Sequence, residues 1–119
     1  METGRSIPQQ HGAAAEQQAA LFLQQRGLSI LTRNYRCRGG EIDLIAQDGN
    51  TLIFVEVRAR RNAHYGGAAA SITRHKQQRL IQAARHYLMH LPTEPICRFD
   101  AILIDGDHLE WLRSAFDDF

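Results

Sequence analysis

Three acidic residues and one arginine occupy alternating positions in two short apolar segments of the chain. The segment EIDLIA at 41–46 carries Glu41 and Asp43, and the segment TLIFVEVRAR at 51–60 carries Glu56 and Arg58. Carboxylates are the ligands that a hard divalent cation such as Mg²⁺ prefers, together with water and phosphate oxygens. These residue types therefore favour a metal-dependent site for phosphodiester hydrolysis, in which Arg58 contacts the phosphate.

The two segments are expected to form a hairpin that gathers these residues on one face. They flank QDGN, and Asp-Gly is a strong hairpin signal. A turn centred on that Asp-Gly pair gives a register of 46 with 51, 43 with 54 and 41 with 56. Glu41 would then face Glu56 beside Asp43, and like charges so placed destabilise a sheet unless a cation lies among them. The alternative is a solvated Glu and Arg pair at a sheet edge, and a one-residue bulge would break the shared face.

The elements that must position these residues follow from periodicity and turn signals. We expect a helix over 12–27 that ends at Gly27, and a second helix over 73–91 that Pro92 ends. We expect strands at 29–36, 41–46, 51–58 and 98–105, a loop at 60–70, and a short hairpin partner formed by HLEWLR. The order is helix, three strands, helix, strand. If the last strand lies parallel to 51–58, the second helix is its crossover, which predicts an α/β fold with a mixed central sheet flanked by helices.

Length and composition bound the class of protein. With 119 residues we expect one domain over 1–119, with flexible ends at 1–11 and 117–119. No apolar run approaches the roughly 20 residues that span a bilayer, and no signal peptide is recognisable. Cys37 and Cys97 form no metal-binding or disulfide pattern. We therefore expect a soluble cytoplasmic protein with no membrane partner.

The basic residues are concentrated in the middle of the chain. Between Arg26 and Arg85 there are 11 basic residues and four acidic ones. This charge suits a polyanion such as DNA, because neutralising phosphates releases counterions; the alternative is a solvated, arginine-rich surface. The candidates for contacting nucleic acid are Arg38, Arg60, Arg61, Lys76 and Arg79.

Four blocks of the sequence carry a resemblance to a known family. GAAAEQQAALFLQQRGLSILTRNYR, GGEIDLIAQDGNTLIFVEVRAR, ITRHKQQRLIQAARHYL and RFDAILI resemble the small bacterial YraN-like family, over about Gly12 to Phe116. That family is assigned to the restriction-endonuclease-like PD-(D/E)xK superfamily and is similar to Holliday-junction resolvases. The resemblance implies a restriction-endonuclease-like core of order αβββαβ and a Mg²⁺ or Mn²⁺ cofactor. It also implies catalytic roles for Asp43, Glu56 and the first-helix acid Glu16.

One position departs from the family pattern. The lysine of the ExK motif is replaced by Arg58, while Arg60 matches the second basic residue and Lys76 matches a lysine of the second helix. Arginine stays charged and acts only as an electrostatic clamp, whereas a desolvated lysine can help activate water.

Three functional classes therefore stay open. The first is a DNA endonuclease acting on branched or single-stranded DNA. The second is a nucleic-acid-binding or partner-binding module without turnover, and the third is a dimerising scaffold. A chain this short also leaves room for a homodimer or a larger protein partner.

Overall fold

The computed structural model describes the backbone of residues 6–60 and 72–116, and the side chains of 12–59 and 72–116. Its elements, in chain order, are α1 (Ser6–Gln25), β1 (Ser29–Cys37), β2 (Gly40–Asp48), β3 (Thr51–Arg60), α2 (Arg74–Leu88), β4 (Ile96–Asp105) and β5 (His108–Phe116). The order αβββαβ is confirmed, and the predicted hairpin partner is a full strand of nine residues, β5. Helix α1 begins at Ser6 rather than Gly12, so residues 6–11 of the predicted flexible end are helical. The rest of the predicted flexible ends, at 1–5 and 117–119, and the predicted loop after Arg60 lie outside the described residues.

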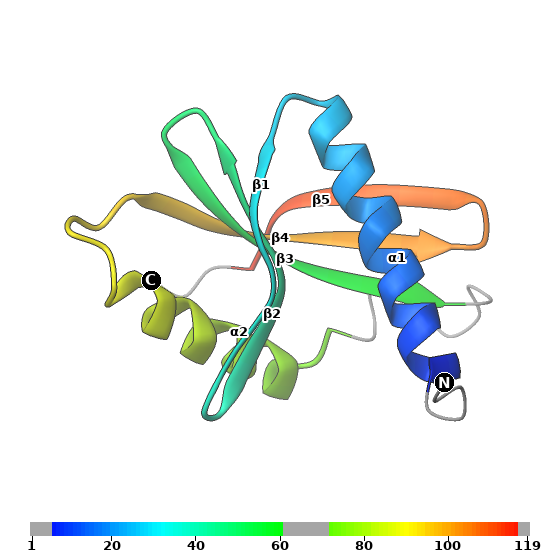
Figure 1. Ribbon diagram of the computed structural model, residues 1–119, viewed down its shortest axis with the longest axis horizontal. Helices are drawn as coiled ribbons and strands as arrows, with labels where there is room; N and C mark the ends of the chain where they lie inside the picture. The colour runs from blue at the N-terminus through cyan, green and yellow to red at the C-terminus, as the bar shows by residue number, and fades with distance from the viewer. Residues whose placement is uncertain (1–5, 61–71, 117–119) are drawn as a thin grey trace.

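The five strands form one mixed sheet in the order β1-β2-β3-β4-β5. Neighbouring strands are antiparallel except β3 and β4, which pair in parallel from Thr51 with Ile96 to Arg60 with Asp105. Parallel neighbours need a crossover, and α2 lies in the connection between them. The predicted α/β fold with a mixed sheet is confirmed, and the architecture is compatible with a restriction-endonuclease-like core (Figure 1).

The two helices pack on opposite faces of the sheet. The apolar stripe of α1, with Leu23 fully buried, meets Leu44, Val55 and Ile102. The apolar stripe of α2 meets a second set of strand residues, in which Phe54 is fully buried. Two separate cores therefore hold the central strands β2 and β3 from both sides.

Within the described ranges, no helix is long and apolar enough to cross a membrane.

The register of the β2–β3 hairpin differs from the predicted one by two residues. Asp48 pairs with Thr51 and Leu44 with Val55, so the two loop residues are Gly49 and Asn50. Gly49 has φ of 61°, the positive value that a type II′ turn requires at its first loop position. Because side chains alternate with period two, a two-residue shift leaves every residue on its predicted face.

Helix α2 is held close to the start of β2 by a glycine. A Cβ atom on Gly40 would overlap the carbonyl oxygen of Arg79 and lie 2.9 Å from the backbone nitrogen of Ala83. No side chain fits between these two backbones. Gly40 therefore sets how near the N-terminal half of α2 comes to the sheet.

A buried carboxylate fastens β5 to β4. The side chain of Asp100 is fully buried and accepts hydrogen bonds from the guanidinium of Arg98, from Trp111 Nε1 at 2.9 Å and from the backbone N–H of Ser114 at 2.9 Å. The β4–β5 register shifts between Phe99 and Ala101, and Ser114 has φ of 52°. Asp100 thus satisfies the backbone N–H of Ser114, which this irregularity takes out of the ladder, as well as two side-chain donors.

Candidate functional site

The site lies where β2 and β3 separate. Their pairing ends at Leu44 and Val55, after which, among the described strands, β2 pairs only with β1 and β3 only with β4. Figure 1 shows this separation: β1 and β2 run together to the bottom of the view, while β3 runs to the right beside β4. The next residues on the two strands are Asp43 and Glu56, so the predicted hairpin acids lie at the point of separation.

The carboxylate of Asp43 accepts a backbone hydrogen bond directly beyond the end of the β2–β3 ladder. Its Oδ2 accepts a hydrogen bond of 2.8 Å from the backbone N–H of Val57. This bond satisfies an N–H group that the separation of the strands removes from the β2–β3 ladder, and it fixes the direction of the carboxylate.

Two glutamates lie against Asp43. Glu16 from α1 and Glu56 from β3 each interact with Asp43 through charge and through a side-chain hydrogen bond. Burial, and then the charge of Asp43, raise the pKa of Glu56 from 4.5 to about 8. The same two causes, in the same order, raise the pKa of Glu16 to about 7. Three carboxyls from three elements therefore share one small region: Glu16 from α1, Asp43 from β2 and Glu56 from β3.

Arg58 lies beside this group. Its guanidinium NH1 is 3.4 Å from Glu56 Oε2, and both side chains are partly or largely shielded, at 29% and 11% exposure. The positive charge of Arg58 lowers the pKa of Glu56, but less than burial and Asp43 raise it. Arg58 therefore offers the cluster a fixed positive charge next to its most buried acid.

The carboxyls line a cavity of about 470 Å³ that both helices border. From α2, Lys76 and Arg79 line it, and the charge of Lys76 lowers the pKa of Glu56. Thr73 begins the helix by accepting a bond from the backbone N–H of Lys76 at 3.2 Å. Lys76 and Arg79, both candidates for contacting nucleic acid, therefore lie at the cavity of the acids.

Glu41 is placed differently from the prediction. It lines the same cavity but does not face Glu56, because the true register brings Asp43 level with that residue. Glu41 instead pairs across the β1–β2 ladder with Arg36, whose Nε lies 3.7 Å from Glu41 Oε1, and both side chains are well exposed. The predicted contact of Glu41 with Glu56 is therefore wrong, because the turn lies at Gly49 and Asn50 and the observed register differs by two residues.

The remaining predicted basic residues are only partly described. Arg38 is exposed in the turn between β1 and β2, next to Gly39, which borders a shallow depression that His75 and Arg79 also line. Arg60 ends β3, but its side chain is outside the described set, as is all of Arg61.

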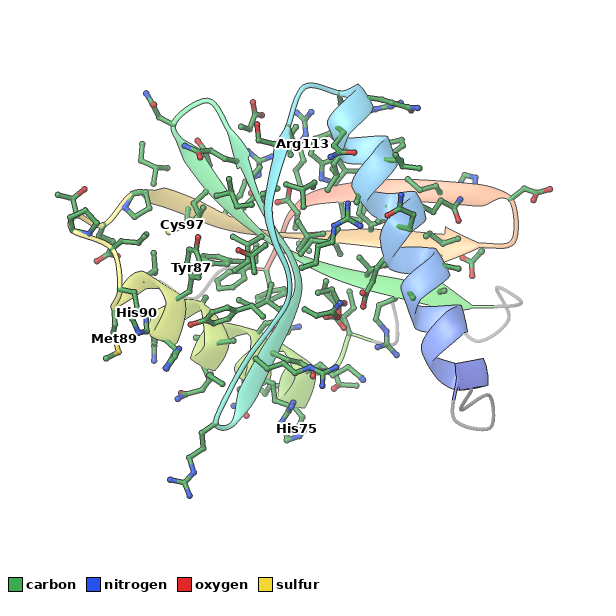
Figure 2. The ribbon with its side chains drawn as sticks, viewed as in Figure 1. His75, Tyr87, Met89, His90, Cys97 and Arg113 are labelled. Atoms are coloured by element: carbon green, nitrogen blue, oxygen red, sulfur yellow. The ribbon has the colours of Figure 1, made fainter. Side chains whose placement is uncertain are left out.

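Two residues at the site escaped the sequence analysis. Asn34 has φ of 52°, and its side chain hydrogen-bonds Glu16, which lowers the pKa of that acid. Asparagine tolerates this backbone conformation, but its type alone did not place it at the acids. His75 lines the cavity from the first turn of α2, and Figure 2 shows it at the opposite end of that helix from Met89. Its position directly before Lys76 was the available signal.

The donor set fits an ion that keeps much of its water. Among the side chains at 12–59 and 72–116, no three His, Cys, Asp or Glu residues are grouped so as to hold a metal ion by themselves. Mg²⁺ is usually bound through one or two carboxylates, with water and substrate phosphate completing its shell. The contact between Asp43 and Glu56, with Glu16 beside them, supplies this kind of donor.

Fold and site together define a small α/β protein whose central strands separate around a carboxyl cluster bordered by basic residues. The uncharacterised protein family UPF0102 matches residues 15–104 of the chain. The chain belongs to this family, which confirms the resemblance to YraN-like proteins at the level of the family. The matched region contains Glu16, Asp43, Glu56 and Arg58.

Several bacterial relatives are similar over nearly their whole length. A UPF0102 protein of Nitrosomonas eutropha is 60% identical over 108 residues, covering 90% of this chain and 93% of the relative. One from Nitrosospira multiformis is 55% identical over 109 residues, covering 89% and 92%. One from Janthinobacterium sp. is 52% identical over 113 residues, covering 95% and 92%.

Proposed function

We propose that the protein is a Mg²⁺- or Mn²⁺-dependent endonuclease of the PD-(D/E)xK type that hydrolyses DNA phosphodiester bonds. The observation that supports this most directly is the contact of Glu16 and Glu56 with Asp43 at the separation of β2 and β3. Burial, and then the charge of Asp43, raise the pKa of Glu56 and of Glu16. Ionising these two glutamates beside Asp43 therefore destabilises the fold, and a divalent cation would remove that repulsion.

Asp43 and Glu56 would hold the ion, with Glu16 completing the set directly or through water. Glu41, at the exposed border of the cavity, is a further candidate ligand. When bound, such an ion polarises a phosphoryl oxygen and lowers the pKa of a bound water. Because Glu56 and Glu16 hold protons up to about pH 8 and 7, loading the site requires both to release them.

The positive side chains around the cluster would bind the substrate. Arg58 would contact the scissile phosphate and offset the negative charge that develops there. Lys76 and Arg79 line the same cavity from α2, and Arg38 lies exposed beyond them. These residues provide a basic approach for the phosphate backbone, with no dependence on base sequence.

The test is a cleavage assay on single-stranded, duplex, flap and four-way-junction DNA with Mn²⁺, Mg²⁺ or EDTA. Asp43→Asn and Glu56→Gln should each reduce metal-dependent cleavage by about a hundredfold or more, while DNA binding in EDTA persists or tightens. Asp48→Asn is the matched control, because this acid is exposed at the other end of β2. Cleavage that survives both substitutions would overturn the proposal.

A second candidate is a nucleic-acid-binding or partner-binding module without turnover. The observation that favours it is the ion pair of Glu56 with Arg58, a residue that cannot take up a proton from water. In that case every substrate is bound but none is cut, and Asp43→Asn and Glu56→Gln leave the function unchanged. Cutting by an Arg58→Lys variant alone would locate the defect at this residue.

A further inference from the structure

A second cavity adjoins the carboxyl cavity on the side of α1. It has a volume of about 530 Å³, a size typical of pockets that take small organic molecules. Its walls come from the α1 segment between Gly12 and Gln18, from the end of β3 and from the end of β4. Lys76 and Arg79, which line the carboxyl cavity, are not among its lining residues.

The chemistry of this second cavity is unlike that of the first. Ala15, Val57 and Ile104 form a buried apolar floor, and Ala14 and Ala59 border it at the surface. Among the described lining residues, the only charged ones are those that the two cavities share. The apolar walls therefore suit an uncharged, flat or aliphatic group rather than a phosphate.

The two cavities adjoin each other. Gly12, Glu16, Val57 and Arg58 line both of them, so a molecule that places its phosphate at Arg58 has the apolar cavity directly beside it. In a polynucleotide, the groups next to a phosphate are its sugar and base. A base in a continuous duplex is stacked and paired, and it reaches a pocket only when it is unpaired or flipped out.

We propose that the cavity between Ala14 and Ala59 binds an unpaired nucleobase adjoining the scissile phosphate, so that the protein selects DNA with an unstacked nucleotide at that point. This rests on the proposed function for the position of the phosphate. The substrate class is then single strands, flaps or junctions rather than uninterrupted duplex. The alkyl surfaces of Val57 and Ile104 contact the flat face of the base. Because every base has a flat π-face, this contact does not depend on the base sequence.

One polar group is available for the edge of the base. The side chain of Gln18 is exposed and lines the cavity from α1. A primary amide both donates and accepts hydrogen bonds, so it can pair with the edge of any of the four bases. Gln18 therefore adds a contact without imposing a strong sequence preference.

The experiment measures binding of fluorescently labelled octanucleotides in EDTA. One probe is an ordinary single strand, and the other has the same phosphates but abasic sugars at its central positions. We expect the ordinary strand to bind roughly tenfold more tightly, the effect of burying about 50 Å² of one base against apolar side chains. Ala14→Phe, which fills the cavity, should abolish this difference, and Ala59→Leu should reduce it. Ala13→Phe is the matched control, because Ala13 is exposed on the same helix and lines neither cavity.

Each result is decisive for the cavity. Equal binding of the two probes by the wild-type protein, or a preference that survives both Ala14→Phe and Ala59→Leu, would overturn the inference and assign the cavity to something other than DNA. Failure of the proposed function looks different. A base preference that Ala14→Phe removes, together with no cleavage of any substrate in Mn²⁺, supports base binding and rejects hydrolysis.

Discussion

Val57 donates its backbone N–H to the carboxylate of Asp43 at 2.8 Å, directly beyond the last paired residues of β2 and β3. The same carboxylate is the hydrogen-bond and charge neighbour of Glu16 and Glu56. Asp43 therefore joins the structural and the chemical roles of this region. It completes the edge of the separated strands, and it gathers one acid from α1 and one from β3.

The raised pKa of Glu56 predicts a pH-dependent stability. Burial raises this pKa from 4.5 to about 8, so above pH 4.5 the folded state keeps a proton that the unfolded state releases. The free energy of unfolding should therefore fall as the pH rises from 4.5 to about 8. Glu56→Gln cannot ionise, and it should lose much of this decline; the rest belongs to Glu16.

Urea denaturation in EDTA across this pH range measures the effect. Glu110→Gln is the control, because Glu110 is exposed on β5, and its curve should run parallel to that of the wild-type protein. If the curve for Glu56→Gln also ran parallel to wild type, the acid would not be held protonated in the folded protein.

Arg58 should affect DNA cleavage directly through its charge, and it should affect Glu56 through the ion pair between the two side chains. Arg58→Ala should weaken cleavage roughly tenfold or more, because the cavity loses its fixed charge beside the acids. Arg58→Lys should restore or exceed wild-type cleavage, since a desolvated lysine can assist water activation. Single-turnover rates in Mn²⁺ separate these variants. Arg113→Ala, on β5, should leave the rate unchanged, and a loss equal to that of Arg58→Ala would point to general charge effects.

Asp100 should be important for stability and unimportant for DNA. Asp100→Ala removes the partner of Arg98 and leaves the N–H groups of Trp111 and Ser114 without their acceptor. We expect a loss of about 3–5 kcal/mol in the free energy of unfolding, as for other broken buried pairs. Asp107→Ala, an exposed acid in the neighbouring turn, should change it by less than about 0.5 kcal/mol. Equal midpoints for the two variants in urea would contradict this role.

Gly40 and Gly12 should respond to alanine in opposite directions. Gly40→Ala places a methyl group against the backbone of α2 and should cost about 1–3 kcal/mol. Gly12 lies within α1 with nothing within 4 Å of its added Cβ, so Gly12→Ala should stabilise the protein by about 0.5–1 kcal/mol. Thermal unfolding of both variants checks this, and a neutral Gly40→Ala would show that α2 is free to move outward.

Turn signals and side-chain periodicity in short segments of the sequence predicted much of the fold. The Asp-Gly turn, the alternating strands and the stop at Pro92 predicted the hairpin and the second helix. The parallel β3–β4 pair was stated only as a condition, and the structure meets it. The register was wrong by two residues because the positive φ of Gly49 belongs to the first loop position, which a centred turn misplaces. The predicted faces survived, since an even shift preserves the alternation of side chains.

The identities of Asp43, Glu56 and Arg58 were available from the residues themselves, because charged residues in apolar segments are costly to place without a purpose. Glu16 was indicated only by the resemblance to the family. The arrangement of these four residues was decided only by the tertiary structure. Whether Glu41 or Asp43 stands beside Glu56 depends on one turn, and the cavity exists because β2 and β3 separate after Leu44 and Val55. Strand separation and helix packing are non-local, so no short window of sequence specifies them, whereas turns and periodicity are set by neighbouring residues.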